Sequence, residues 1–234
     1  MGTRWLANFL GSSIGSKVTV AVSGLVLFGF VLGHLAGNLL VFRGKGALND
    51  YAEFLAHQPG LVWTVRAVLL VALLAHVSMA IRLQLRNRAA RPQPYARNAT
   101  VQASLASRQM LLSGLLVLAY IVYHLLHFTV GATDHAAFEQ VEQVVRNGAT
   151  VQRHDVYRMV VTGFGHVPVA AAYVVANALL AWHLSHGVSS LFQTLGIDDP
   201  RYLSWIRRGG IGLAAVIGAG FISIPLCVQL GLIA

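Results

Sequence analysis

Long apolar runs separated by short polar segments give this chain its pattern. Five runs are present, at about residues 18–42, 61–85, 107–130, 156–192 and 206–233. Each is long enough to cross a bilayer as a helix, which needs about 20 apolar residues, and a helix satisfies its own backbone groups there. The pattern therefore predicts an all-α membrane protein, in which residues 1–234 form a single domain of five transmembrane helices packed as an antiparallel bundle.

Composition supports this prediction. Hydrophobic residues make up 56% of the chain and charged residues 11%, whereas a soluble domain is about 25% charged. The net charge of +9 comes from basic residues between the apolar runs, which indicates membrane topology rather than nucleic-acid binding. The single cysteine, Cys227, excludes an internal disulfide and an iron–sulfur cluster held by this chain. The first residues lack the pattern of a secretory signal, so we expect no cleaved leader.

Charged residues divide unevenly between the two ends of the predicted helices. The N-terminus and the segments 82–108 and 198–208 together hold eleven basic and two acidic residues. The other connecting segments hold six basic and six acidic residues. By the positive-inside rule, the N-terminus is expected in the cytoplasm and the C-terminus on the outer side.

The sequence also predicts local structure in one connecting segment and at one proline. Residues 134–153 have an apolar spacing that predicts a short surface helix. Pro168 is expected to bend the fourth helix, because proline lacks a backbone N–H. We expect no internal repeat and no low-complexity segment.

Each of the first four apolar runs offers one histidine that we single out: His34, His76, His124 and His183. An ionisable group at membrane depth is costly and marks a functional site by default, and imidazole is an axial ligand of haem iron. At about 1.5 Å rise per residue, His34 and His124 share one depth, and His76 and His183 share another about 12 Å away. The two pairs predict two bis-histidine clamps, each holding a b haem. For any single histidine, the alternative is a hydrogen bond across helices.

The other histidines carry weaker expectations. His127 and His186 each follow a proposed ligand by three residues, so they are the alternative ligands, haem-propionate contacts or interface residues. His166 is expected to make a structural contact or a contact to the outer haem. The last three are expected to be solvated loop residues: His57, His135 and His154.

Five stretches, in order, carry a resemblance to a known family. They are SSIGSKVTVAVSGLVLFGFVLGHLAGNLLVF, NDYAEFLAHQPGLVW, HVSMAIRLQLRNRAARPQPY, ASRQMLLSGLLVLAYIVYHLLHFT and WHLSHGVSSLFQTLGI. Together they resemble the single-chain di-haem cytochrome b membrane anchor of succinate:quinone oxidoreductases and quinol:fumarate reductases, over the chain up to the fifth run. The resemblance implies that His34 and His124 ligate the distal haem iron, and that His76 and His183 ligate the proximal one.

The resemblance also implies partners and a substrate. A covalent-flavin subunit and a three-cluster iron–sulfur subunit would dock on the cytoplasmic side, and a quinone, often menaquinone, would react near the distal haem. Glu53 is expected, in preference to Asp50, to transfer the quinone proton as a general base. The alternative for each is a solvated loop carboxylate. The residues expected near the haem propionates, or otherwise in an ordinary interface, are Ser13, Ser16, Lys17 and Arg108.

These expectations define one function and its competitors. The chain is expected to be the haem-bearing anchor of a succinate dehydrogenase in a bacterial or archaeal cytoplasmic membrane. It would pass electrons from the iron–sulfur subunit through two haems to menaquinone or another quinone, while the dicarboxylate active site lies in a partner. The alternatives are the cytochrome b subunit of a quinol:fumarate reductase, hydrogenase or formate dehydrogenase, and a haem-free scaffold or transporter. A higher oligomer of the three-subunit unit is left open, and no nucleic-acid partner is expected.

Overall fold

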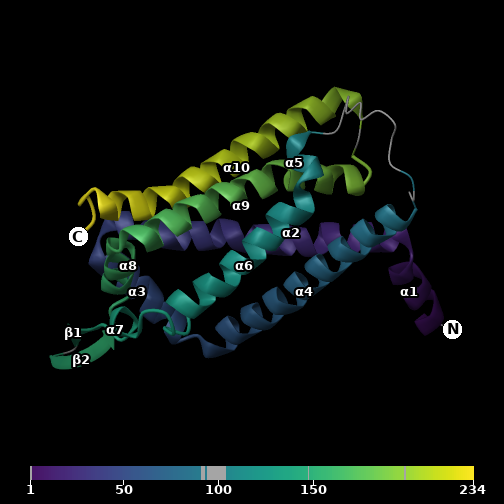
Figure 1. Ribbon diagram of the computed structural model, residues 1–234. Coiled ribbons are helices and arrows are strands. Elements are labelled where there is room, and N and C mark those ends of the chain that lie inside the picture. The colour runs from purple at the N-terminus through teal and green to yellow at the C-terminus, as the bar shows by residue number, and fades with distance from the viewer. Residues whose placement is uncertain (1, 91–92, 94–103, 147, 198) are drawn as a thin grey trace. The chain divides into compact units, whose positions relative to one another are not determined.

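The computed structural model describes residues 2–90, 93, 104–146, 148–197 and 199–234. Among these residues, five helices are long and apolar enough to cross a membrane (Figure 1). They are α2 (Ser13–Asn38, extended by the 3-10 helix η1, Leu39–Arg43), α4 (Pro59–Ala89), α6 (Met110–Phe128), α9 (Val167–Thr194) and α10 (Pro200–Gln229). Helices account for about 81% of the residues that the structure describes, which agrees with an all-α membrane protein. Three residues of the charge count lie outside the described part: Arg91, Arg97 and Asp198.

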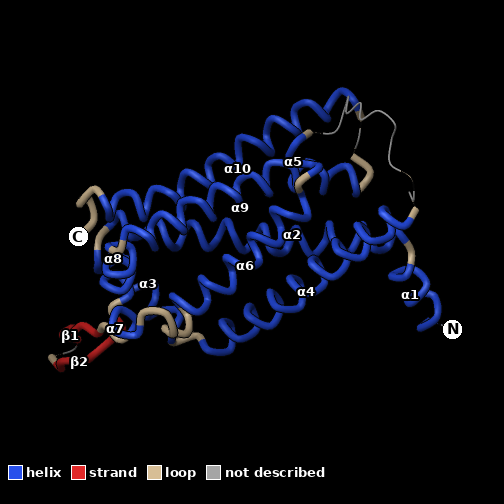
Figure 2. The backbone as a smooth tube through the Cα atoms, in the orientation of Figure 1, coloured by secondary structure: helices blue, strands red, loops and turns tan. Residues whose placement is uncertain are grey.

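Shorter elements precede or connect these helices. They are α1 (Gly2–Gly11), α3 (Lys45–Ala56), α5 (Leu105–Arg108), α7 (His135–Phe138), β1 (Val141–Arg146), β2 (Ala149–His154) and α8 (Val156–Gly165). The surface helix predicted across residues 134–153 is wrong for most of that segment. Only α7 is helical, and an antiparallel hairpin of β1 and β2 follows it (red in Figure 2). β-Branched residues favour the strands, and Gly148 supplies a positive φ of 79° at the turn.

The fourth apolar run is interrupted at His166. It divides into α8 and α9 because Pro168 has no N–H to donate and its ring crowds the carbonyl of Phe164. The carbonyls freed at this break are bound from another helix: Gln229 Nε2 lies 2.5 Å from Phe164 O and 3.1 Å from Gly165 O. The predicted bend is therefore a complete break, closed by a side chain of α10.

Contacts divide the chain into two compact units, each built from parts of all five long helices. Unit 1 comprises Met1–Val31, Arg66–Leu115 and Ala181–Ala215. Unit 2 comprises Leu32–Val65, Leu116–Leu180 and Val216–Ala234. The sequence predicts one domain, whereas the contacts form two units that draw on the same helices.

Each unit has its own internal ties. In unit 1, the guanidinium of Arg82 donates to the carbonyls of Leu10 and Gly11, at 3.1 Å each, and so binds α4 to the C-terminal end of α1. In unit 2, a buried cluster forms the core: Val41, Leu48, Phe164, Tyr173, Ile224, Val228 and Ile233. Ile224 and Val228 come from α10, so the last helix completes the core of unit 2.

Candidate functional site: two histidine pairs

Two histidines face each other in unit 1. The ring centroids of His76 on α4 and His183 on α9 are 6.5 Å apart, and their ring planes are 69° apart. Each ring is held through Nδ1 by a neighbouring helix. His76 Nδ1 lies 3.1 Å from Val20 O and 3.3 Å from Ser23 Oγ, both on α2, and His183 Nδ1 lies 3.1 Å from Ser113 Oγ on α6. The two histidines are therefore oriented by two other helices in the same way.

Hydrogen-bond directions around these rings assign their tautomer. Ser23 Oγ donates to the carbonyl of Thr19 at 2.6 Å, and Ser113 Oγ donates to the carbonyl of Met110 at 3.2 Å. A hydroxyl carries one proton, so each serine accepts from an imidazole Nδ1–H. The carbonyl of Val20 also requires a donor on His76. This pattern favours a proton on Nδ1 of both rings, inferred from their hydrogen-bond partners, which leaves Nε2 with its lone pair, as in a metal ligand.

Glycines beside these serines leave room for the rings. A Cβ added at Gly24 would lie 3.1 Å from His76 Cε1, and one added at Gly114 would lie 3.2 Å from His183 Cε1. Both distances are shorter than an ordinary van der Waals contact. The imidazoles therefore pack directly on the helix backbone at these two positions.

The serines and glycines belong to a repeat that the expectation of no internal repeat overlooked. Ser23-Gly24-Leu25 on α2 corresponds to Ser113-Gly114-Leu115 on α6, and in each helix a histidine follows the serine by eleven residues. Those histidines are His34 and His124. Each of these two helices therefore supplies one histidine and one serine–glycine step that holds a histidine of another helix. A search for the spacing S-G-L-x8-H would have found both serines.

Unit 2 contains the second pair. The ring centroids of His34 on α2 and His124 on α6 are 5.8 Å apart, with ring planes 78° apart. Tyr173 Oη lies 3.5 Å from His124 Nδ1, and the ring of Phe221 lies 5.9 Å from that of His34. This pair is therefore surrounded by aromatic side chains, whereas the pair in unit 1 is held by serines.

His127 occupies a different position from His124. Its side chain is buried, its Nδ1 lies 3.0 Å from Tyr173 Oη, and its ring stacks on Phe128 at 4.0 Å. A Cβ added at Gly163 would lie 3.1 Å from its Nε2. Of the roles expected for His127, that of an interface residue fits this placement, because the ring packs against α8 and its Nδ1 is hydrogen-bonded to Tyr173.

The remaining histidines belong to neither ring pair. His186 is half-buried in α9. The side chain of His166 is exposed at the break between α8 and α9, with Nε2 4.0 Å from Asp134 Oδ2. The three others are exposed, as expected: His57, His135 and His154. The prediction that they lie in loops is wrong for His135, which begins α7, and for His154, which ends β2.

Glu53 lies in an ion-pair network of unit 2. Its Oε2 is 2.7 Å from Arg146 Nη2 and 2.9 Å from Arg153 Nη1, and Arg153 Nη1 is also 2.5 Å from Asp50 Oδ1. The sequence singled out the two carboxylates but not the arginines, because the arginines are about a hundred positions away. The expected role of Glu53 in proton transfer stays a prediction, now for a carboxylate held by two guanidinium groups.

The same network continues to the start of α8. Lys45 Nζ lies 2.7 Å from both Glu142 Oε2 and Asp155 Oδ2, and Asn49 Nδ2 donates to both acids. Burial alone would raise the pKa of Asp155 and of Glu142, but hydrogen bonds from Lys45 and Asn49 outweigh it and lower both. Hydrogen bonds to these acids raise the pKa of Lys45. These contacts therefore favour the charged forms of Lys45, Glu142 and Asp155.

The residues expected near the haem propionates differ in how much of each side chain is exposed. Ser16 is fully buried and donates to Ser12 O at 2.8 Å. The other three are exposed: Ser13, Lys17 and Arg108. Their role at a haem stays a prediction.

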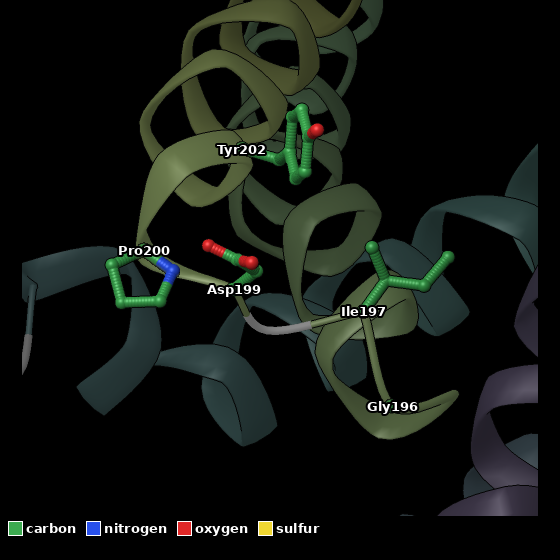
Figure 3. A pocket seen from close by; sticks show the side chains of 5 residues that line it. All are labelled: Gly196, Ile197, Asp199, Pro200 and Tyr202. Carbon is green, nitrogen blue, oxygen red and sulfur yellow. The ribbon is translucent and has the colours of Figure 1, made fainter.

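A shallow, open hollow lies between the end of α9 and the start of α10 (Figure 3). Its lining consists of Gly196, Ile197, Asp199, Pro200 and Tyr202. Asp199 Oδ1 accepts from the backbone N–H of Arg201 at 2.9 Å and so caps α10; hydrogen bonds from Arg201 lower the pKa of Asp199. This hollow lies at the turn between two helices, and its lining residues include no histidine.

Spacing between the paired rings matches that expected for two imidazoles on one metal ion. Each nitrogen lies about 2 Å from a bound ion, which places the ring centroids about 6 Å apart. The measured separations are 5.8 Å and 6.5 Å. The residues present therefore fit a metal group that would be held between the two histidines of each pair.

Comparisons of this chain with protein-family models, with curated proteins and with solved structures find no match. The two histidine pairs, each drawn from two helices, are accordingly the observations on which a function rests.

Proposed function

We propose that the chain is a di-haem cytochrome b membrane subunit, in which His34 and His124 ligate one haem iron and His76 and His183 the other. The observation that carries this proposal is the pairing itself. Two histidines from different helices face each other at 5.8 Å in one unit, and two more do so at 6.5 Å in the other.

The number of protein ligands favours haem over a bare metal ion. Structural and catalytic zinc sites use three or four protein ligands. In the described part of the chain, no three His, Cys, Asp or Glu side chains come together to hold a metal. Two imidazoles per site suit an iron that brings four equatorial nitrogens of its own. When bound, such a group carries one electron at a time.

The chain's own residues would orient the ligands and keep water away. Ser23, Ser113 and the carbonyl of Val20 fix the rings of unit 1. In unit 2, Tyr173 is buried and contacts His124. Buried ligands with fixed tautomers reorganise little when charge changes, which suits electron transfer.

We further propose a place in a larger complex, on the strength of the resemblance and the charge distribution. The chain would anchor a succinate dehydrogenase in a bacterial or archaeal cytoplasmic membrane, with the N-terminus and the arginine-rich connections on the cytoplasmic side. The flavoprotein and iron–sulfur subunits would dock there, and menaquinone or another quinone would accept electrons at the far end. Succinate oxidation itself would occur in the flavoprotein.

A reduced-minus-oxidised optical spectrum of the purified chain, with haem counted by the pyridine method, tests the haem assignment. We expect two low-spin b haems per chain. His76→Ala and His34→Ala should each lower the count to one, whereas His57→Ala, at an exposed histidine, should leave two. A chain made with ample haem that binds none would contradict the proposal, as would a count unchanged by His76→Ala.

Affinity purification from the native membrane tests the complex. A tag on the chain should recover a flavoprotein and an iron–sulfur protein, and succinate should reduce the bound haems. If the chain carries two haems that succinate does not reduce, it would be assigned to a different membrane oxidoreductase.

A further inference from the structure

Two buried serines occupy equivalent places around the histidines of unit 1. Ser23 and Ser113 are 6% and 5% exposed, and each contacts a histidine on another helix at 3.3 Å and 3.1 Å. Each hydroxyl also donates to its own helix, to the carbonyls of Thr19 and Met110. The hydroxyl oxygen is thereby turned toward the imidazole as an acceptor.

We propose that Ser23 and Ser113 are positioning residues, which hold His76 and His183 in the Nδ1–H tautomer and lower the midpoint potential of the haem between them. The effect on potential rests on the proposed function, because it needs a haem at that pair. The effect on the tautomer does not, because the hydrogen bonds are made by the protein alone.

The direction of the effect follows from ligand basicity. An acceptor on Nδ1–H makes the imidazole a stronger electron donor through Nε2. A stronger donor stabilises the ferric state more than the ferrous state, and hydrogen bonding around the ligands is one means by which proteins set haem potentials. Removing the acceptor should therefore raise the midpoint potential.

The chain offers matched controls on the ligand helices. Ser78 and Ser185 each follow the histidine of their helix by two residues. Their hydroxyls donate to their own helices, to Ala75 O at 3.3 Å and Trp182 O at 2.7 Å. The same change from serine to alanine at these sites removes a hydroxyl without touching the Nδ1 bonds.

Redox titration of the haem-loaded chain is the first test. His76→Ala identifies which of the two haem signals in the titration belongs to unit 1. In Ser23→Ala and Ser113→Ala, the midpoint potential of that signal should become more positive, while that of the other haem stays unchanged. The shift should be larger for Ser113→Ala, because His76 keeps the carbonyl of Val20 as an acceptor. Ser113→Thr should restore the original midpoint, and Ser78→Ala and Ser185→Ala should not move it. Fully loaded variants with unchanged midpoints would overturn the proposal.

Nitrogen-15 NMR of histidine-labelled chain prepared without haem is the second test. We expect the shifts of His76 and His183 to report the Nδ1–H tautomer, and Ser113→Ala to convert His183 to a mixture of tautomers. A wild-type His183 with its proton on Nε2 would overturn the positioning role. Binding of no haem by a chain that passes this test would overturn the proposed function and leave the positioning role intact.

Discussion

The ammonium group of Lys45 lies 2.7 Å from the carboxylate of Asp155, a side chain that is almost fully buried at the start of α8. Asp155 also caps this helix, since its Oδ1 accepts the backbone N–H of Arg158 at 3.0 Å. One carboxylate thus joins α3 to α8 and closes the first turn of α8.

Replacing this carboxylate should weaken unit 2. Asp155→Ala leaves Lys45 and Asn49 with Glu142 as their remaining carboxylate and removes the cap of α8, and loss of a helix cap costs about 1 kcal/mol. We expect a lower melting temperature of the purified chain in detergent. Glu139→Ala is the control: its carboxylate is exposed and pairs with an exposed histidine, so the melting temperature should barely change. Equal effects of the two changes would contradict the role given to Asp155.

Stability supplied by this network should depend on pH in a defined way. The folded-state pKa values of Asp155 and Glu142 are lowered, so their contribution is present above the unfolded values of about 4 and is lost as the pH falls through the folded values. The pKa of Lys45 is raised, so its contribution is present below about 10.4 and is lost as the pH rises through the folded value.

The difference in melting temperature between wild type and Lys45→Met isolates this effect. It should be constant between about pH 5 and 9 and should shrink on either side. A difference that grows as the acids protonate would show that the pair is not the source of the stability.

Side chains added at the two serine–glycine steps should disturb the histidines of unit 1. In Gly114→Val, the added Cβ lies 3.2 Å from His183 Cε1, and the larger branches must displace the ring. We expect haem content to fall from two to one per chain, measured by the pyridine method. Gly209→Ala, at an exposed position with nothing within 4 Å of an added Cβ, should keep two. Full haem content in Gly114→Val would show that the ring does not need this space.

Removing the hydroxyl of Tyr173 tests the contacts of unit 2. Tyr173→Phe keeps the ring in its aromatic cluster but loses the bond to His127 at 3.0 Å and the contact to His124 at 3.5 Å. A lost hydrogen bond costs about 1 kcal/mol, so thermal stability should fall slightly while two haems remain bound. Tyr202→Phe, at an exposed tyrosine, should be neutral. Loss of a haem in Tyr173→Phe would mean that the hydroxyl, rather than packing, fixes His124.

Gly131 adopts a φ of 73°, and a Cβ there would lie 2.4 Å from the ring of Phe138. Gly131→Ala should therefore destabilise the chain by about 1–3 kcal/mol, through backbone strain and this clash. Gly46→Ala, where nothing lies within 4 Å, is the matched comparison for melting temperature. An unchanged melting temperature in Gly131→Ala would show that the turn after α6 can rearrange freely.

Properties that follow from position along the chain were predictable. Apolar run length predicted the five long helices, and the fixed rise of a helix paired His34 with His124 and His76 with His183; in the structure each pair lies within one unit. Hydropathy does not specify how a helix is rotated about its axis. The contacts of Ser23 and Ser113 depend on that rotation, so the sequence did not reveal them.

The sequence also did not predict interactions between segments that are far apart along the chain. Arg153 meets Glu53 across a hundred positions, and this contact exists only because residues 141–154 form a hairpin instead of the predicted helix. The apolar spacing of Ala137, Val141, Val144 and Val145 does not distinguish the two periods over so short a segment. The arginines became partners of the carboxylates only through the strand pairing.

The side-chain amide that closes the break before α9 has a consequence for biogenesis. The carbonyls of Phe164 and Gly165 are bound by Gln229, which the ribosome adds more than sixty residues later. Synthesis proceeds at about 5–20 residues per second, so for several seconds the nascent fourth segment has two backbone acceptors that its own helix cannot satisfy. Within the membrane such acceptors are costly. The C-terminal helix thus acts as the closing step of assembly, and a truncated product would expose this break to the quality-control proteases of the membrane.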